Sequence, residues 1–138
     1  MLGADTIGMH GDMLLSKPRD YESAKCMLKR MSDDWHRVIT AVCIRYQGKE
    51  LNVSVCSNVR FRAISEAEIE AYWATGEPQD KAGAYAIQGM GAQFVQYITG
   101  SYSGVMGLPL FETSELLTHL GFSPLLRREK CQKMLHVH

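Results

Sequence analysis

Residues 38–55 run V-I-T-A-V-C-I-R-Y-Q-G-K-E-L-N-V-S-V, and this stretch decides the predicted fold. Val38–Tyr46 is rich in β-branched and apolar residues, which is typical of a buried strand. The tripeptide Q-G-K that follows predicts a turn. From Leu51 to Val55 apolar residues alternate with polar ones, which predicts a strand with one exposed face. The two strands are therefore expected to lie side by side as part of a meander.

Shorter strands and helices are expected on both sides of this pair. Asp20 is a good N-cap for a helix that runs to about Met31. Ser65 and Glu68 make a capping box at the start of a second helix, and a third helix is expected over residues 112–120. The other strand-like segments are Leu2–Met9, Met13–Leu15, Val59–Ala63 and Phe94–Ile98.

This mixture of strands and helices predicts an α/β domain of the α+β-like kind, with an elongated mixed β-sheet flanked by helices. The chain has 138 residues, which suits one domain with a sizeable core. We assign residues 1–122 to that domain and residues 123–138 to a basic C-terminal tail.

Composition excludes several classes of partner. The 15 basic and 15 acidic residues give a net charge of zero, so no basic excess favours a nucleic acid polymer or an anionic membrane. No apolar run approaches the roughly 20 residues that a membrane-spanning helix needs. The four cysteines show no C-x-x-C spacing, which favours reduced thiols in a cytoplasmic protein.

The segment Glu77–Gly89, E-P-Q-D-K-A-G-A-Y-A-I-Q-G, is dense in side chains that can do chemistry. Its glycines let backbone N–H groups approach a ligand closely, and Lys81 beside them can meet a phosphate. A polar surface loop is the alternative interpretation of the same composition. Glu77 and Asp80 have two open roles, as metal ligands or as salt-bridge partners of Lys81.

Two further segments place charges beside apolar runs. Asp5 lies inside the strand-like run G-A-D-T, where aspartate is disfavoured unless it faces a cleft, a metal or a hydrogen-bond network. Lys17 precedes a proline at a strand exit. One carboxylate, the two lysines Lys17 and Lys81, and a glycine-rich backbone are suited to phosphoryl chemistry. The lysines offset phosphate charge, while the carboxylate holds Mg²⁺ or activates water.

Five ordered motifs resemble the Maf family of nucleoside triphosphate pyrophosphatases. They are G-A-D-T at Gly3–Thr6, K-P at Lys17–Pro18, S-x-x-x-H-x-V-x-T-A-V at Ser32–Val42, E-P-x-D-K-A-G-A-Y-x-I-Q-G at Glu77–Gly89, and G-S-Y-x-x-V-x-G-L-P-L at Gly100–Leu110. The motifs extend over most of the chain and keep the family's order.

The resemblance implies hydrolysis of a nucleoside triphosphate between its α and β phosphates, with Mg²⁺ or Mn²⁺ as the divalent cation. It also implies an inosine-triphosphatase-like, two-lobed fold and a cytoplasmic homodimer. Asp5 matches the family's proton acceptor for the attacking water, and it is also the tentative metal ligand. Thr6 and Gln88 match positions tied to base selection, and the I-Q-G form is similar to the branch that takes dTTP and UTP.

The chain departs from the family pattern in three places, one of which is Asp33-Asp34, where a glycine is usual after Ser32. The family's N-terminal S-x-S-P-R-R segment has no counterpart, so we expect an N-terminally truncated domain. Ala86 stands where the family usually has glycine. Three functions follow: a pyrophosphatase acting on dTTP, UTP and modified pyrimidine nucleotides, a catalytically weak or inactive nucleotide-binding remnant, or a non-enzymatic, septum-related interaction protein.

Overall fold

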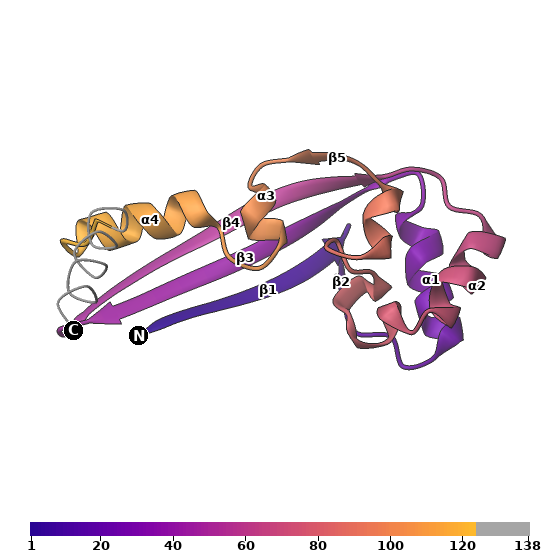
Figure 1. Ribbon diagram of the computed structural model, residues 1–138, viewed down its shortest axis with the longest axis horizontal. Coiled ribbons are helices and arrows are strands. Elements are labelled where there is room, and N and C mark those ends of the chain that lie inside the picture. Colours follow the sequence, from indigo (N-terminus) through magenta and orange to yellow (C-terminus); the bar gives the residue numbers. More distant parts are fainter. Residues whose placement is uncertain (124–138) are drawn as a thin grey trace, which may run out of the picture.

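The computed structural model describes residues 1–123, which form a long β-sheet with a group of helices at one end (Figure 1). The sheet has five strands in the order β2-β1-β3-β4-β5. The strands are β1 (Leu2–His10), β2 (Met13–Leu15), β3 (Trp35–Tyr46), β4 (Lys49–Phe61) and β5 (Val95–Thr99). The expected α/β fold with an elongated sheet flanked by helices is confirmed.

Each strand pair within residues 1–123 is antiparallel, although the sequence had predicted a mixed sheet. Two of the connections are tight turns, which join antiparallel neighbours directly. The helical connection between β2 and β3 returns the chain to the far side of β1, where β3 also pairs antiparallel. Parallel pairing would need a crossover that these connections do not make.

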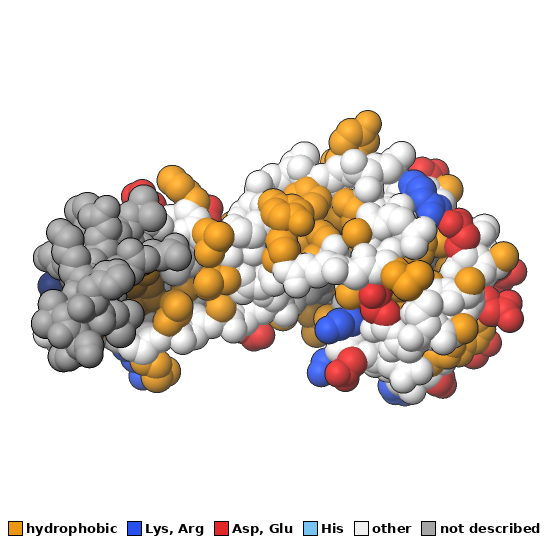
Figure 2. Space-filling view, viewed as in Figure 1, with side chains coloured by type: hydrophobic (Ala, Val, Ile, Leu, Met, Phe, Trp, Pro, Cys, Tyr) orange, Lys and Arg blue, Asp and Glu red, His pale blue; other side chains and the backbone are white. Residues whose placement is uncertain are grey.

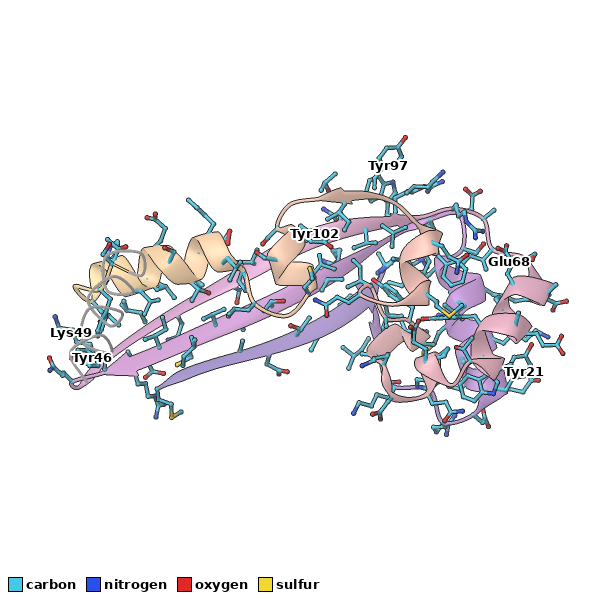
Figure 3. The ribbon with its side chains drawn as sticks, viewed as in Figure 1. Tyr21, Tyr46, Lys49, Glu68, Tyr97 and Tyr102 are labelled. Atoms are coloured by element: carbon cyan, nitrogen blue, oxygen red, sulfur yellow. The ribbon has the colours of Figure 1, made fainter. Side chains whose placement is uncertain are left out.

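The β3–β4 hairpin forms as predicted and is the longest feature of the sheet. Its register runs from Trp35 opposite Arg60 to Tyr46 opposite Lys49. The turn between the strands consists of Gln47 and Gly48, with φ values of 49° and 76°. Two consecutive residues with positive φ match the twist of the flanking strands. Tyr46 and Lys49 therefore mark the tip of the hairpin, far from Glu68 at the helical end (Figure 3).

Strand alternation decides which face of the sheet is covered. On β3 the side chains of Val38, Thr40, Val42 and Ile44 are buried. The residues between them are exposed or half-buried, so the opposite face of the sheet is largely open. The predicted alternation in β4 follows the same rule.

The two predicted helix starts are confirmed. Helix α1 (Tyr21–Met31) is capped by Asp20, whose carboxylate accepts a 2.8 Å hydrogen bond from the Ser23 backbone N–H. Helix α2 (Glu66–Ala74) begins with the capping box of Ser65 and Glu68. Both helices lie at the same end of the sheet (Figure 1).

The hydrophobic core lies where α1 and α2 meet the ends of β3 and β4. Leu28 from α1, Ile69 from α2 and Phe61 from β4 are 0% exposed, and Phe94 is 2% exposed. Rings pack edge to face within this core, with 5.1 Å between the centroids of Tyr72 and Phe94. The core therefore anchors the loop that follows α2.

The third helix begins earlier than predicted. Helix α4 spans Leu110–His119 and starts directly after Pro109. The segment expected as a glycine-rich turn contains a short helix, α3 (Tyr102–Val105), because the Ser101 hydroxyl accepts from the Gly104 backbone N–H at 2.9 Å. Three single 3₁₀ turns, η1 (Glu77–Asp80), η2 (Ala82–Ala84) and η3 (Met90–Phe94), shape the loop after α2.

Other expectations concern the compartment and the tail. Cys26, Cys43 and Cys56 are free thiols, as predicted, whereas Cys131 lies outside the described residues. No helix within residues 1–123 has the length and apolar character to cross a membrane. Most of the predicted tail, residues 124–138, also lies outside the described part, so the division into a domain and a tail stays a prediction.

Candidate active site

A pocket of about 100 Å³ lies where β1 and β3 meet the loop after α2 and helix α3. It brings together residues from four of the five motifs that the sequence singled out. The lining residues are Thr6, Ile7, Gly8, Leu15, His36, Val38, Ala82, Tyr85, Ile87 and Val105. Gln88 is exposed and directly follows Ile87 in this lining.

The fifth motif lies beside this pocket. The Gly83 backbone N–H donates a 3.0 Å hydrogen bond to the Ser16 carbonyl oxygen, which ties the segment of Lys17 to the segment of Lys81. Both lysine side chains belong to exposed residues, and neither forms an ion pair within residues 1–123. Two ammonium groups are thus available to an anion near the pocket.

Thr6 faces the covered side of the sheet. Its hydroxyl oxygen lies 2.9 Å from the hydroxyl oxygen of Thr40, which is completely buried. Thr40 in turn donates a 2.6 Å hydrogen bond to the carbonyl oxygen of Gly104 in α3. This row of polar groups joins β1, β3 and α3 behind Thr6, which lines the pocket.

Asp5 points to the opposite face of the sheet, because consecutive residues of a strand alternate between faces. It is exposed, and it lines a shallow basin of about 390 Å³ with Ala41, Asn52 and Ser54 among its neighbours. Strand β2 pairs only with the last three residues of β1, so among the described strands the outer edge beside Asp5 is open.

Glu77 organises the loop that carries Gln88. Its carboxylate accepts hydrogen bonds from the Tyr72 hydroxyl, from the Met90 N–H at 2.9 Å and from the Gly91 N–H at 3.1 Å. The Tyr72 hydroxyl also accepts from the Ala86 N–H at 3.0 Å. Tyr72 and Glu77 therefore hold the loop on both sides of Gln88.

These contacts also explain the nearby glycines. A Cβ atom on Gly89 would lie 2.7 Å from Glu77 Cδ, and one on Gly91 would lie 2.7 Å from the Tyr72 hydroxyl oxygen. No side chain larger than hydrogen fits these distances without a shift of the carboxylate or the ring. The two glycines make room for the internal carboxylate, a role that sequence reasoning did not anticipate.

The environment shifts the pKa of both members of this pair. Burial raises the pKa of Glu77, but the hydrogen bonds from Tyr72, Met90 and Gly91 outweigh burial and hold it below its ordinary value. Burial and the neighbouring Glu77 carboxylate raise the pKa of the Tyr72 hydroxyl. The carboxylate is therefore ionised and the hydroxyl protonated near neutral pH. Within residues 1–123 Glu77 forms no ion pair with Lys81, and Asp80 is exposed with no side-chain hydrogen bond.

His36 is a second contact between the sheet and this loop. It is 2% exposed, and its Nε2 atom lies 2.8 Å from the Tyr85 hydroxyl oxygen. Burial lowers the pKa of His36 to about 4, so the ring is neutral at pH 7. Sequence reasoning placed His36 in a motif but gave it no role, and Tyr72 lay outside every motif.

Asp5 is the candidate ligand for a divalent cation. Within residues 1–123 no group of three or more His, Cys, Asp or Glu side chains is placed to hold a metal ion. Asp5 offers one exposed carboxylate with no hydrogen-bond partner among the described residues. Mg²⁺ commonly binds through one or two carboxylates together with substrate phosphates and water. Asp5 fits that manner of binding.

Comparison with known protein families agrees with the resemblance that the motifs indicated. A family model described as Maf-like protein matches residues 1–120. The chain belongs to the Maf-like protein family. All the residues that line the pocket lie within the part of the chain that the family model matches.

Curated relatives of this Maf-like chain carry one enzyme name. A dTTP/UTP pyrophosphatase of Hahella chejuensis is 49% identical over 122 residues, which is 88% of this chain and 60% of the relative. The protein of the same name from Alkalilimnicola ehrlichii is 54% identical over 117 residues, 85% of this chain and 57% of the relative. The one from Vibrio cholerae is 50% identical over 117 residues, 85% of this chain and 63% of the relative. The chain thus spans about 60% of the length of these relatives.

Proposed function

We propose that this Maf-like chain acts as a nucleoside triphosphate pyrophosphatase on dTTP and UTP, giving the monophosphate and pyrophosphate. The observation that carries the proposal is the pocket in which Thr6, Tyr85, Ile87 and Val105 converge from three separate motifs. The names of the relatives support this enzyme over a nucleotide-binding remnant or a septum-related interaction protein. Modified pyrimidine nucleotides are further candidate substrates.

In this proposal the base and the triphosphate have separate partners. Thr6 and Gln88 contact the pyrimidine base, since Thr6 lines the pocket and Gln88 follows its Ile87 wall. Lys17 and Lys81 offset the charge of the phosphates, which is consistent with their exposure and their lack of ion-pair partners in the described residues.

The proposed chemical step is an attack of water on the α-phosphorus. Asp5 accepts a proton from that water, and the bond between the α-phosphorus and the α–β bridging oxygen breaks, so that pyrophosphate leaves with this oxygen. Mg²⁺ or Mn²⁺, held by Asp5 together with the substrate phosphates, would neutralise the negative charge that develops on the phosphates. Lys17 and Lys81 orient the triphosphate for this attack.

Glu77 and Asp80 receive different roles. The carboxylate of Glu77 already accepts three hydrogen bonds, which supports a role in holding the loop rather than in binding a metal. Asp80 has an exposed carboxylate, so it remains the candidate for a direct or cation-mediated contact to phosphate.

We also propose that the chain is a cytoplasmic homodimer. Hydrophobic side chains gather around α3 and beside α4 (Figure 2). Four of them are markedly exposed: Tyr102 at 58%, Met106 at 38%, Leu110 at 63% and Phe111 at 71%. Contiguous exposed apolar surface is typical of an interface. Light scattering on Leu110→Lys and Phe111→Lys should show dissociation, and a monomeric unsubstituted chain would exclude the dimer.

Pyrophosphate release tests the proposed activity. The rate is measured with dTTP, UTP and 7-methyl-GTP in the presence of Mg²⁺ or Mn²⁺, for the unsubstituted chain and for Asp5→Asn. We expect release from dTTP and UTP that Asp5→Asn reduces by about 10²-fold or more, the scale of a lost general base. Equal background rates for both proteins would refute the enzyme. Glu70→Gln is the matched control, because Glu70 is an exposed acid on α2.

A further inference from the structure

The hydrogen bonds of Thr40 have only one consistent direction. Its hydroxyl oxygen lies 2.6 Å from the Gly104 carbonyl oxygen and 2.9 Å from the Thr6 hydroxyl oxygen. A carbonyl oxygen can only accept, and a threonine hydroxyl carries one hydrogen, so Thr40 donates to Gly104. Thr40 has no second hydrogen for Thr6. Thr6 must therefore donate to Thr40.

The acceptor at the end of this row is held in place. Gly104 belongs to α3, and its N–H donates a 2.9 Å hydrogen bond to the Ser101 hydroxyl that caps this helix. Thr40 is 0% exposed, so water does not compete for its hydroxyl. The Gly104 carbonyl oxygen of α3 therefore sets the donor-to-acceptor direction of the hydrogen bonds from Thr6 to Thr40 and from Thr40 to Gly104.

This direction fixes what Thr6 can offer to a ligand. The single hydroxyl hydrogen of Thr6 is used by Thr40, so only oxygen lone pairs remain toward the pocket that Thr6 lines. Thr6 is half-buried, which leaves part of it accessible. The Thr6 hydroxyl can therefore accept a hydrogen bond from a ligand but cannot donate one.

Gln88 cannot supply the same selectivity. A primary amide presents two donors or an acceptor according to how it is turned, and a half-turn exchanges them. Uracil and thymine carry an N3–H donor between two carbonyl groups, whereas cytosine has an acceptor at N3 and an amino donor at C4. An amide that is free to turn can pair with either pattern. Discrimination needs a group that cannot turn.

We infer that Thr40 is a specificity-determining positioning residue, which holds the Thr6 hydrogen so that Thr6 selects the N3–H of uracil and thymine against cytosine. The inference rests on the proposed function, because it places a pyrimidine base beside Thr6. It goes beyond that function by assigning a role to a fully buried residue that does not touch the base.

Two substitutions separate the roles of Thr40 and Thr6. Thr40→Val keeps the branched shape but frees the Thr6 hydrogen, so Thr6 can donate to cytosine. We expect kcat/KM for dCTP to rise about tenfold while that for dTTP changes by less than about threefold. Thr6→Val removes the acceptor, so kcat/KM for dTTP should fall about tenfold without a gain for dCTP.

Conservative and distant variants complete the test. Thr40→Ser keeps the hydroxyl and should restore the preference for dTTP, which loss of packing alone would not do. Thr99→Val makes the same change at an exposed site on β5 and should leave the preference unaltered. An unchanged ratio of dTTP to dCTP in Thr40→Val, or a ratio lost equally in Thr40→Ser, overturns the inference.

Equilibrium binding of dTTP and dCTP separates this inference from the proposed activity. If the unsubstituted chain releases no pyrophosphate, the proposed activity fails, but the ratio of the two dissociation constants still tests Thr40. A ratio that favours dTTP and approaches one in Thr40→Val supports the inference. Equal affinity for both nucleotides, or no binding of either, in the unsubstituted chain overturns it.

Discussion

Replacing Glu77 by glutamine tests whether this carboxylate braces the loop. The carboxylate accepts from Met90 N–H through Oε1, and from Tyr72 and Gly91 through Oε2. Glutamine retains one oxygen, so its amino group must face at least one of these donors. The substitution is nearly isosteric, and therefore it changes hydrogen bonding and charge with little change in volume.

The magnitude follows from the bonds that are lost. One hydrogen bond to a charged group contributes about 1.5–3 kcal/mol, and a donor left unpaired adds about 1–3 kcal/mol where water is excluded. Glu77 is half-buried, so water can satisfy part of that demand, and we discount the sum to about 2 kcal/mol. For a chain of this size about 2 kcal/mol corresponds to a fall in Tm of roughly 6–10 °C.

Calorimetry measures the fall in Tm, and amide hydrogen exchange of Met90 and Gly91 shows whether the loop is where stability is lost. Glu70→Gln is the matched control, because Glu70 is exposed on α2 and its side chain has no hydrogen bond or ion pair among the described residues. We expect faster exchange at Met90 and Gly91 in Glu77→Gln alone. A Tm within about 1 °C of the unsubstituted chain, with unchanged exchange, would refute the brace.

Three further predictions concern the same end of the molecule. Gly89→Ala places a Cβ atom 2.7 Å from Glu77 Cδ, so urea denaturation should show a loss of about 2 kcal/mol or more, and a stability equal to that of Gly3→Ala, where a Cβ atom meets nothing within 4 Å, would contradict the packing argument. The free energy of unfolding should decline as pH falls from 4.5 toward 2. A hydrogen bond from Arg62 lowers the pKa of Glu68, and one from Lys29 lowers the pKa of Glu66, in each case from 4.5 to about 2. The stability that these two carboxylates contribute is lost as they protonate in the folded state. NMR titration should find the His36 ring neutral down to about pH 4. The free energy of unfolding should fall as pH drops from 6.5 to 4, because the unfolded chain takes up the proton first. A pKa near 6.5 for His36 would contradict the effect of burial.

Local signals in the sequence were sufficient for the hairpin and for two helix starts. The turn at Gln47–Gly48 and the caps at Asp20 and Ser65 depend on neighbours within four residues, so a single chain displays them. The prediction of a mixed sheet was wrong for residues 1–123, because strand direction depends on where a connection returns. The start of α4 at Leu110 was missed by two residues, since the segment before it was interpreted as an irregular turn.

The site was harder to predict, because its contacts join distant segments. The density of glycines in the loop was interpreted as room for a ligand, whereas Gly89 makes room for a carboxylate 12 residues earlier in the chain, Glu77. The family resemblance assigned Asp5 and Thr6 to one site, and strand alternation directs their side chains to opposite faces of β1. The hydrogen bond of Thr40 to Gly104 spans 64 residues and has no local signature.

The two-residue turn of the β3–β4 hairpin has a consequence for folding kinetics. Pairing can begin at Tyr46 and Lys49 and proceed rung by rung toward Trp35 and Arg60, so each new contact closes only a small additional loop. Strands β1 and β5 each pair with a strand that is distant in sequence, so their docking carries a larger entropic barrier. The hairpin is thus the natural nucleus of this fold, and the pocket, which needs β1 and the loop after α2 at once, belongs to the last structure to assemble.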